Sequence, residues 1–202
     1  MAIETDFFRQ VMGQFATGIT VVTTRNQGTL AGLTVNAFCS VSLEPPLVLI
    51  CVDLTSNTLP HIRESGTFVV NILTNQQEHL SRCFATSSEE RYEHFCHASY
   101  HLAATGSPVI DGVLAFIDAR IVAEYPGGDH VIFVGQVVAM GTGGQVAFAA
   151  DADKRHCSLT ECDGNAPMTD RIPLAYYRGQ YRHLARDYRK PSLAAYYDED
   201  FE

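Results

Sequence analysis

A long stretch in the second half of the chain, in which every second residue is apolar, is the feature that most constrains its fold. Every odd position of Val113–Tyr125 is apolar, whereas charged residues such as Asp118 and Glu124 occupy even positions. A two-residue period of this kind is typical of a β-strand with one buried face and one partly solvated face. A Pro-Gly-Gly-Asp turn follows, and His130–Met140 is the next strand candidate, so the pattern predicts a long antiparallel pair.

Shorter elements are predicted before this pair. Strand patterns occur at Ile19–Thr24, Leu30–Phe38, Leu47–Val52 and Thr67–Leu73. Short helices are expected from Ser56 to near Gly66, from Asn75 to Phe84, and over Arg91–Phe95 after a capping box of Ser87 and Glu90. Because the strands do not alternate regularly with crossover helices, we expect a mainly β protein with short helices, built as a small antiparallel barrel rather than a parallel α/β sheet.

The N-terminal segment has the pattern of an amphipathic helix. Thr5 is a suitable N-cap for it. Apolar residues then recur at helical spacing, at Phe8, Val11, Met12 and Phe15. We therefore expect a first helix with one apolar face.

Composition excludes several classes of function. The 202 residues are 46% hydrophobic and 18% charged, which is ordinary for one globular domain. A formal net charge of −9 disfavours nucleic acids and anionic membranes as general partners, because both are negatively charged. No apolar run approaches the roughly 20 residues that span a bilayer. The acidic N-terminus also lacks the pattern of a secretory signal.

The cysteines indicate a reducing compartment. None of the six belongs to a CxxC pair. Cys39, Cys51 and Cys83 lie in apolar stretches, where a free cysteine behaves as a small hydrophobic residue. We therefore expect a reduced, cytoplasmic protein.

Four possible metal ligands lie close together late in the sequence. They are His156, Cys157, Cys162 and Asp163. Their spacing matches no common structural-zinc pattern, and no second cysteine pair accompanies them. We expect no metal site.

Several segments have residue types that suit a ligand site, and each also has a simpler explanation. Thr34–Phe38 combines small and polar residues that let the backbone approach a flat ligand, but its pattern also fits a strand with one polar face. Ser56–Thr58 offers N–H groups and hydroxyls to an anion, but it also fits a plain N-cap. Arg82 and Arg91 suit pairing with that anion or a solvated surface. His130 follows a Gly-Asp turn, where surface histidines are common.

The order and spacing of these segments resemble the flavin reductase-like family, the short-chain reductase components of two-component flavin monooxygenases. The matching segments are Met12–Gly18, Gly32–Pro46, Ser56–Thr58, Phe68–Leu73, Leu80–Ala85, Gly128–His130, Gly135–Val137 and Pro173–Gly179. The resemblance implies an FMN-binding split β-barrel of the antiparallel Greek-key type. It also implies a homodimer with flavin sites close to the subunit interface.

The same resemblance assigns roles to particular residues. The flavin ring would lie against the segment Thr34, Val35, Asn36 and Ala37, and its edge and ribityl chain against Ser40, Val41 and Ser42. The phosphate would be bound by Ser56, Asn57 and Thr58, with Arg91 favoured over Arg82 as the cation. Phe84 would pack beside the flavin, and His130 would position the nicotinamide or a flavin edge.

Residues 1–185 are expected to form one flavin reductase-like domain. Residues 141–170, which are Gly-rich and then Ala-rich and charged, depart from the family and are expected to be a long inserted loop. Residues 186–202 end in acidic residues and are expected to form a C-terminal tail or an arm on a partner subunit.

The implied function is NAD(P)H-dependent reduction of FMN, with FAD also possible. Hydride would pass from NADH or NADPH to flavin N5, and the reduced flavin would serve a partner monooxygenase. The chain has no Gly-x-Gly-x-x-Gly after a strand, so a separate Rossmann site is not indicated. Two alternatives remain open: an FMN-bound oxidoreductase that acts on a small organic substrate, and a non-enzymatic FMN-binding electron carrier.

Overall fold

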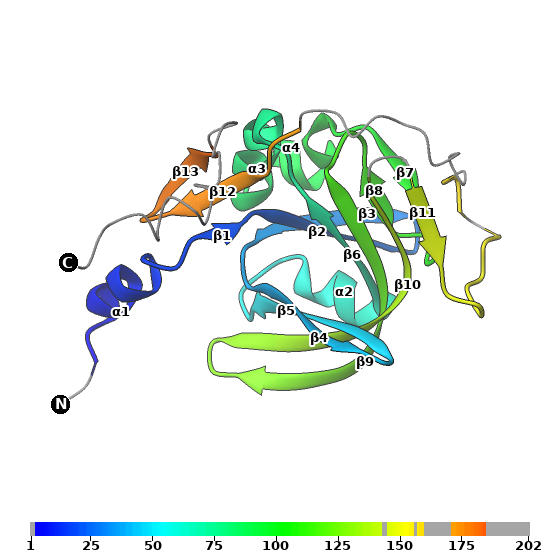
Figure 1. Cartoon of the computed structure of the whole chain (residues 1–202), viewed down its shortest axis with the longest axis horizontal. Coiled ribbons are helices and arrows are strands. Elements are labelled where there is room, and N and C mark those ends of the chain that lie inside the picture. Colours follow the sequence, from blue (N-terminus) through cyan, green and yellow to red (C-terminus); the bar gives the residue numbers. More distant parts are fainter. Residues whose placement is uncertain (1–2, 143–144, 156, 160–170, 185–202) are drawn as a thin grey trace, which may run out of the picture.

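The computed structural model describes residues 3–142, 145–155, 157–159 and 171–184. Its main sheet contains β2 (Thr20–Asn26), β3 (Thr29–Val35), β4 (Phe38–Leu43), β5 (Pro46–Asp53), β6 (Thr67–Ile72), β9 (Ala115–Gly127), β10 (His130–Thr142) and β11 (Gln145–Phe148). Seven of them follow the order β3-β2-β6-β9-β10-β5-β4, β11 pairs with β10, and all these pairs are antiparallel. The sheet curls into a barrel (Figure 1), which confirms the expected mainly β fold and the long β9–β10 pair.

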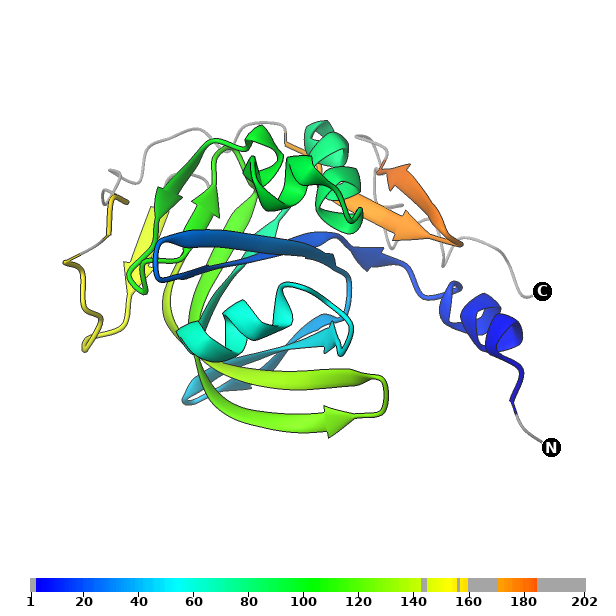
Figure 2. The same ribbon diagram turned by 180° about the vertical axis from the view of Figure 1, so that it is seen from behind.

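The barrel has apolar cores on both faces of its sheet. Val22 of β2 points into the barrel, where it joins Ile62 of helix α2 (Leu59–Ser65). Its neighbour Val21 points to the opposite face and belongs to a second cluster with Phe84. Figure 2 shows α2 lying across the open side of the curled sheet. Strand β2 is therefore buried on both faces, which explains its nearly continuous apolar and threonine sequence.

Short helices cover the outer core. They are the 3₁₀ turn η1 (Asn75–Gln77), α3 (Glu78–Ala85), α4 (Glu89–Tyr92) and the 3₁₀ turn η2 (Phe95–His97). The predicted caps lie one residue off, because Thr74 forms the capping box of η1 and Ser88 caps α4. Similarly, α2 begins at Leu59, three residues after Ser56. Among the described residues, no helix is both long and apolar enough to cross a membrane.

The predicted strand Leu30–Phe38 is confirmed up to Val35, but its last three residues were wrongly included, because Phe38 begins a second strand. Strand β3 ends at Val35, and β4 starts at Phe38 on the opposite edge of the sheet. The two residues between them carry the chain from one edge to the other. There the amide of Cys51 in β5 donates to the carbonyl of Ala37, with an N···O distance of 3.1 Å. The barrel therefore closes at Asn36 and Ala37.

The first helix forms as predicted, but no part of the chain that the structure describes buries it. Helix α1 spans Thr5–Met12, with Glu4 rather than Thr5 at the N-cap, and none of its residues is buried. It stands away from the barrel in both views (Figures 1 and 2). Its apolar side chains are exposed, at Phe7, Phe8, Val11 and Met12.

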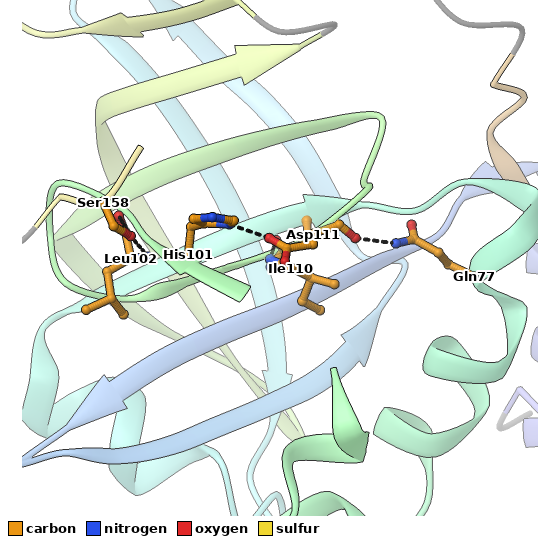
Figure 3. A network of polar contacts seen from close by, with 7 residues as sticks. Gln77, His101, Leu102, Ile110, Asp111 and Ser158 are labelled. Atoms are coloured by element: carbon orange, nitrogen blue, oxygen red, sulfur yellow. Dashed lines mark hydrogen bonds and ion pairs between the residues drawn. The ribbon is translucent and has the colours of Figure 1, made fainter. Parts of the chain in front are cut away.

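The expectation of a long inserted loop is wrong for its first part. Strand β10 extends to Thr142, and β11 pairs back on it with Phe148 opposite Ala139. Beyond β11, the Leu102 amide donates to Ser158 Oγ over 2.7 Å (Figure 3). This bond ties the segment to the small hairpin of β7 (Tyr100–Leu102) and β8 (Pro108–Ile110). Residues 160–170 and the predicted tail 186–202 lie outside the described residues.

The β7–β8 hairpin is also anchored on its other side. Gln77 donates from Nε2 to the Asp111 carbonyl over 2.9 Å, and the His101 ring bonds the Asp111 carboxylate (Figure 3). These contacts connect the hairpin to η1 through one residue, so the outer layer is a continuous unit.

The expectation that the cysteines are free thiols is wrong for one pair. Cys83 and Cys96 form a disulfide between α3 and η2, whereas Cys39, Cys51 and Cys157 are free thiols. Sequence reasoning treated Cys83 as a small apolar residue. It missed the pairing because the two cysteines are thirteen residues apart in an irregular segment.

Asp118 is a buried carboxylate inside the alternating strand β9. It has no exposed surface and accepts hydrogen bonds from the Thr105 amide at 2.9 Å and the Thr105 hydroxyl at 2.6 Å. Burial raises the pKa of Asp118 to about 6, although the Thr105 bonds oppose this shift. The carboxylate holds the turn after β7, and its ionised form is costly there.

We predict that Asp118 makes stability fall as pH rises from about 4 to about 6. The folded state binds this proton more tightly than the unfolded state, so its contribution is fully present below the unfolded pKa and lost above the folded one. Relative to Asp118→Asn, which cannot titrate, the wild-type free energy of unfolding should drop by about 2 kcal/mol between pH 4 and pH 6, out of a total of about 3 kcal/mol over the whole titration. Urea unfolding at several pH values measures it, and a pH-independent difference would contradict the prediction.

Candidate functional site

An open cleft of about 970 Å³ lies where the barrel closes. One wall is the crossing residues Asn36 and Ala37. The other walls come from the N-terminal arm and from a C-terminal hairpin. That hairpin consists of β12 (Leu174–Tyr177) and β13 (Gln180–His183), and it pairs with β1 (Thr17–Gly18) of the arm.

The crossing residues present an exposed backbone and small side chains to the cleft. Asn36 and Ala37 are both exposed. The Asn36 carbonyl accepts from the Phe38 amide at 3.0 Å, and the Ala37 carbonyl accepts from the Cys51 amide. These bonds fix the backbone without filling the cleft. The structure thus places two of the predicted ring-binding residues at a cleft wall that a flat ligand can reach.

Thr17 is a cleft residue that sequence reasoning did not select. Its Oγ1 is buried and has no hydrogen-bond partner among the described residues. An unpaired buried hydroxyl costs about 1–3 kcal/mol, so it suits a ligand that supplies the missing partner. The signal was present, because Thr17 lies in the matching segment Met12–Gly18.

The C-terminal hairpin turn is a second part of the cleft that was not selected. Arg178 and Gly179 both have positive φ, at 52° and 73°, as in the tight turns that suit hairpins. The Arg178 amide donates to the Gly13 carbonyl over 3.0 Å, and its Nε donates to Gln14 Oε1 over 3.0 Å. These bonds hold the turn over the N-terminal arm. The segment Pro173–Gly179 carried the signal for it.

A buried cation occupies a corner beside β3. Arg91 is 7% exposed, and its Nε donates to the Gly32 carbonyl over 2.8 Å. Its Nη2 donates to Thr58 Oγ1 over 3.0 Å, and that hydroxyl also bonds Gly32 at 3.1 Å. Desolvation lowers the pKa of Arg91, but a guanidinium stays charged in proteins. Among the described residues no carboxylate pairs with Arg91 and Nη1 has no partner, so an anion would stabilise it.

The start of α2 borders this corner. Asn57 is exposed, and Ser56 Oγ accepts from the Thr58 amide over 3.3 Å. Hydrogen bonding with Ser87, to which the Tyr92 hydroxyl donates over 3.2 Å, and with Asn57 lowers the pKa of Tyr92, which places Asn57 against α4. Ser56 and Asn57 can therefore meet a ligand at this corner, whereas Thr58 is buried and already bonded.

Phe84 corrects an expectation about ligand contact. Its side chain has no exposed surface, and its ring packs edge-on against Phe95 with centroids 5.1 Å apart. A Cβ on Gly32 would lie 2.8 Å from this ring, so only glycine allows the approach. Phe84 therefore acts through packing between β3 and α3, and its ring cannot touch a ligand in this structure.

The other predicted ring residues are divided between core and surface. Val35 is buried in the barrel core, so only its backbone could meet a ligand. Thr34 is half-buried and donates from Oγ1 to the Ser81 carbonyl over 2.6 Å. The remaining three lie further along edge strand β4, beyond the residues that line the cleft, where the strand bulges between Ser40 and Ser42. Of these, Ser40 and Val41 are exposed and Ser42 is half-buried.

His130 lies outside the cleft of its own chain. It borders a separate groove of about 270 Å³ with Arg63 and Glu124. Its Nδ1 bonds Asp129 Oδ1 at 2.7 Å, and it stands opposite Asp53 in the β5–β10 pair. A single chain therefore does not bring His130 to Asn36 and Ala37.

Asp53 is already engaged near the start of α2. Its pKa is lowered first by the Thr55 hydroxyl bond, then by the Thr55 amide and, more weakly, by the charge of His130. Such a carboxylate is unsuited to binding a phosphate, as expected from its charge.

The corner and the cleft lie at two points along one stretch of chain, from Gly32 in β3 to Asn36 just beyond its end. Between them, Gly32 and Thr34 face α3, where they meet the Phe84 ring and the Ser81 carbonyl. Gly32 and Asn36 are about 13 Å apart along an extended strand. The arrangement suits an elongated ligand with an anionic end and a flat end. A flavin joined to phosphate by a ribityl chain, as in FMN or FAD, fits these residues. The buried Thr17 Oγ1 has no hydrogen-bond partner among the described residues, and Arg91 has no carboxylate partner there.

One group of described side chains has the spacing of possible metal ligands. In the described part of the chain, Glu89, Glu93 and His94 form a group with suitable spacing, and all three are exposed. Of the sequence candidates, His156, Cys162 and Asp163 lie outside the described residues. The expected absence of a metal stays a prediction.

Comparisons with known proteins agree with this geometry. The family model described as flavin reductase like domain matches residues 12–185. The reductase subunit HsaB of a flavin-dependent monooxygenase from Mycobacterium tuberculosis H37Rv is 34% identical over 195 residues, which is 96% of this chain and 89% of HsaB.

Solved structures share the same split-barrel fold. Nitrilotriacetate monooxygenase component B from Mycobacterium thermoresistibile has a TM-score of 0.73 and 33% identity, covering 93% of this chain and 90% of that one. The NADH:FAD oxidoreductase SgcE6 of Streptomyces globisporus, solved with NAD and FAD fragments, has a TM-score of 0.72 and 30% identity, covering 93% and 99%. The chain belongs to the flavin reductase-like family.

Proposed function

We propose that this protein is an NAD(P)H-dependent flavin reductase that uses FMN and supplies reduced flavin to a partner monooxygenase. The observation that carries the proposal is the unneutralised, buried Arg91, which bonds Gly32 of β3 about 13 Å along the chain from Asn36 at the cleft wall. The name of HsaB as the reductase subunit of a flavin-dependent monooxygenase supports the same role.

The residues of the chain would act by binding and orientation. Arg91 with Ser56 and Asn57 binds the flavin phosphate, and the backbone of Asn36 and Ala37 meets the polar edge of the ring. The flavin itself, when bound, supplies the redox chemistry. An ordered slot open on one side lets a nicotinamide stack on the exposed ring face, so proximity and orientation supply the catalysis.

The remaining assignments belong to the same proposal. FMN is preferred, although FAD carries the same ribityl phosphate. The co-substrate is NADH or NADPH, and His130 acts as a positioning group for the nicotinamide or the flavin edge. Residues 1–185 form one domain with a C-terminal tail or arm after it, and the protein works in the cytoplasm.

Turnover with and without added flavin tests the proposed activity. We expect oxidation of NADH or NADPH that depends on added FMN, with release of reduced flavin. Absorbance at the nicotinamide band measures it. Tightly bound flavin with negligible nicotinamide oxidation would favour the electron carrier or the enzyme acting on a small organic substrate. Absence of flavin binding at micromolar concentration would overturn all three.

Arg91→Met tests the phosphate corner. Charged hydrogen bonds contribute about 1.5–3 kcal/mol, so we expect FMN affinity to fall by about 10- to 150-fold. Affinity for riboflavin, which has no phosphate, should change by less than about twofold. Quenching of flavin fluorescence measures both dissociation constants.

Arg82→Met is the matched control for Arg91→Met. Arg82 is exposed and its Nη2 lies 2.6 Å from Glu78 Oε1 on the same helix, so its loss should leave FMN binding unchanged. Equal losses of FMN and riboflavin affinity in Arg91→Met would contradict the phosphate assignment.

We also propose that the protein is a homodimer formed through α1. Phe7 and Phe15 are 64% and 72% exposed, and the apolar face of α1 between them is uncovered. Contiguous apolar surface of this kind marks a contact with another molecule. Phe8 and Met12 of the same segment line the cleft, so a second copy there would stand beside the site.

The double variant Phe7→Asp, Val11→Asp tests the dimer without altering cleft-lining residues. We expect the wild type to sediment as a dimer and this variant as a folded monomer, because two charges would enter the apolar contact. Sedimentation velocity measures the change, with exposed Gln76→Asp as the control. A monomeric wild type at micromolar concentration would refute the proposal.

A further inference from the structure

The disulfide Cys83–Cys96 encloses the helix that carries Arg91. Cys83 lies in α3 and Cys96 in η2, with Cα atoms 6.0 Å apart, and α4 lies between them in the sequence. The disulfide therefore closes a short loop around the cation of the proposed phosphate corner. Closing a loop of this length restricts the alternative conformations open to its residues.

Local structure alone holds this loop weakly. Helix α4 has four residues, far below the length at which a helix is stable by itself. Phe95, Cys96 and His97 all have left-handed φ values, of 48°, 53° and 52°. Such a conformation is unfavourable for a non-glycine residue and persists only where the surroundings impose it. Cys96, at the centre of the three, is fixed by its covalent bond to Cys83.

Arg91 depends on the position of this loop. Its guanidinium must stay desolvated while it reaches the Gly32 carbonyl and the Thr58 hydroxyl, which belong to β3 and to the start of α2. Burial lowers the pKa of Arg91, so a return to water is favourable once the loop loosens. The Cys83 end of the disulfide is only half-buried, so a small dithiol can reach it from solvent.

We propose that the Cys83–Cys96 disulfide positions Arg91, so that its reduction selectively weakens binding of the flavin phosphate. The proposal rests on the phosphate role proposed for Arg91. In the reduction, a dithiol transfers two electrons and two protons, the S–S bond becomes two thiols, and the dithiol becomes a disulfide. The affinity for FMN then depends on whether Cys83 and Cys96 are oxidised to the disulfide or reduced to thiols.

The effect is confined to the phosphate end. The Ala37 carbonyl accepts from Cys51 of β5, the Asn36 carbonyl accepts from Phe38 of β4, and the hairpin turn at Arg178 is held by the N-terminal arm. Neither contact involves residues 83–96. Binding of a flavin ring without phosphate should therefore survive reduction.

The test compares FMN and riboflavin affinities of the full chain before and after treatment with dithiothreitol. Mass mapping of alkylated Cys83 and Cys96 confirms the state of the disulfide. We expect reduction to lower FMN affinity by at least about tenfold and riboflavin affinity by less than about twofold. The variant Cys83→Ala, Cys96→Ala should match the reduced protein and no longer respond to dithiothreitol, whereas Cys157→Ala should respond as the wild type does.

Three outcomes would overturn the inference. Unchanged FMN affinity after complete reduction shows that the disulfide does not position Arg91. Parallel loss of FMN and riboflavin binding, including loss through unfolding, shows a general structural role. Arg91→Met, measured alongside, separates the two proposals: if it weakens FMN binding selectively and reduction does not, the phosphate corner stands and the redox inference fails. If Arg91→Met has no selective effect, both fail.

Discussion

The close contact between Gly32 and the Phe84 ring fixes where strand β3 meets the helical layer. A Cβ at residue 32 would lie 2.8 Å from the ring, so the absence of a side chain sets the separation of β3 and α3. The Gly32 carbonyl then accepts hydrogen bonds from Arg91 and Thr58, which belong to α4 and to the start of α2. One backbone position thus determines where three helices stand relative to the sheet, and it brings a cation to the sheet surface.

The two faces of β3 divide structural and functional roles. Leu33 and Val35 point into the barrel core, whereas Gly32 and Thr34 face outward. Because the inward residues are anchored in a close-packed core, the outward ones are held at fixed spacing. The strand therefore supplies a rigid base for the proposed ligand site, and its end at Asn36 is also the point where the barrel closes.

Patterns of buried and exposed residues within one element were predictable from the sequence. The alternation in Val113–Tyr125 indicated the long β9–β10 pair, and the small residues around Asn36 indicated a place of close approach. The crossing within Leu30–Phe38 was not predictable by periodicity, because apolar residues continue through it. Arg91 was selected through resemblance, but its burial depends on contacts with β3 and α2 that only the folded chain assembles.

The remaining differences have specific physical causes. Phe84 was expected beside a ligand. Because Gly32 has no side chain, the Phe84 ring instead packs against β3 and is buried in the core. The amphipathic pattern of α1 correctly indicated a helix, yet within residues 3–142, 145–155, 157–159 and 171–184 no surface covers its apolar face. The periodicity of apolar residues in the sequence indicates which side chains favour burial, but it does not specify which molecule covers them. In the proposed homodimer that requirement is met by a second copy, and the cleft that Phe8 and Met12 line would lie at the contact. Folding of one chain and completion of its site are then separate steps, and only the first is encoded in contacts within the chain.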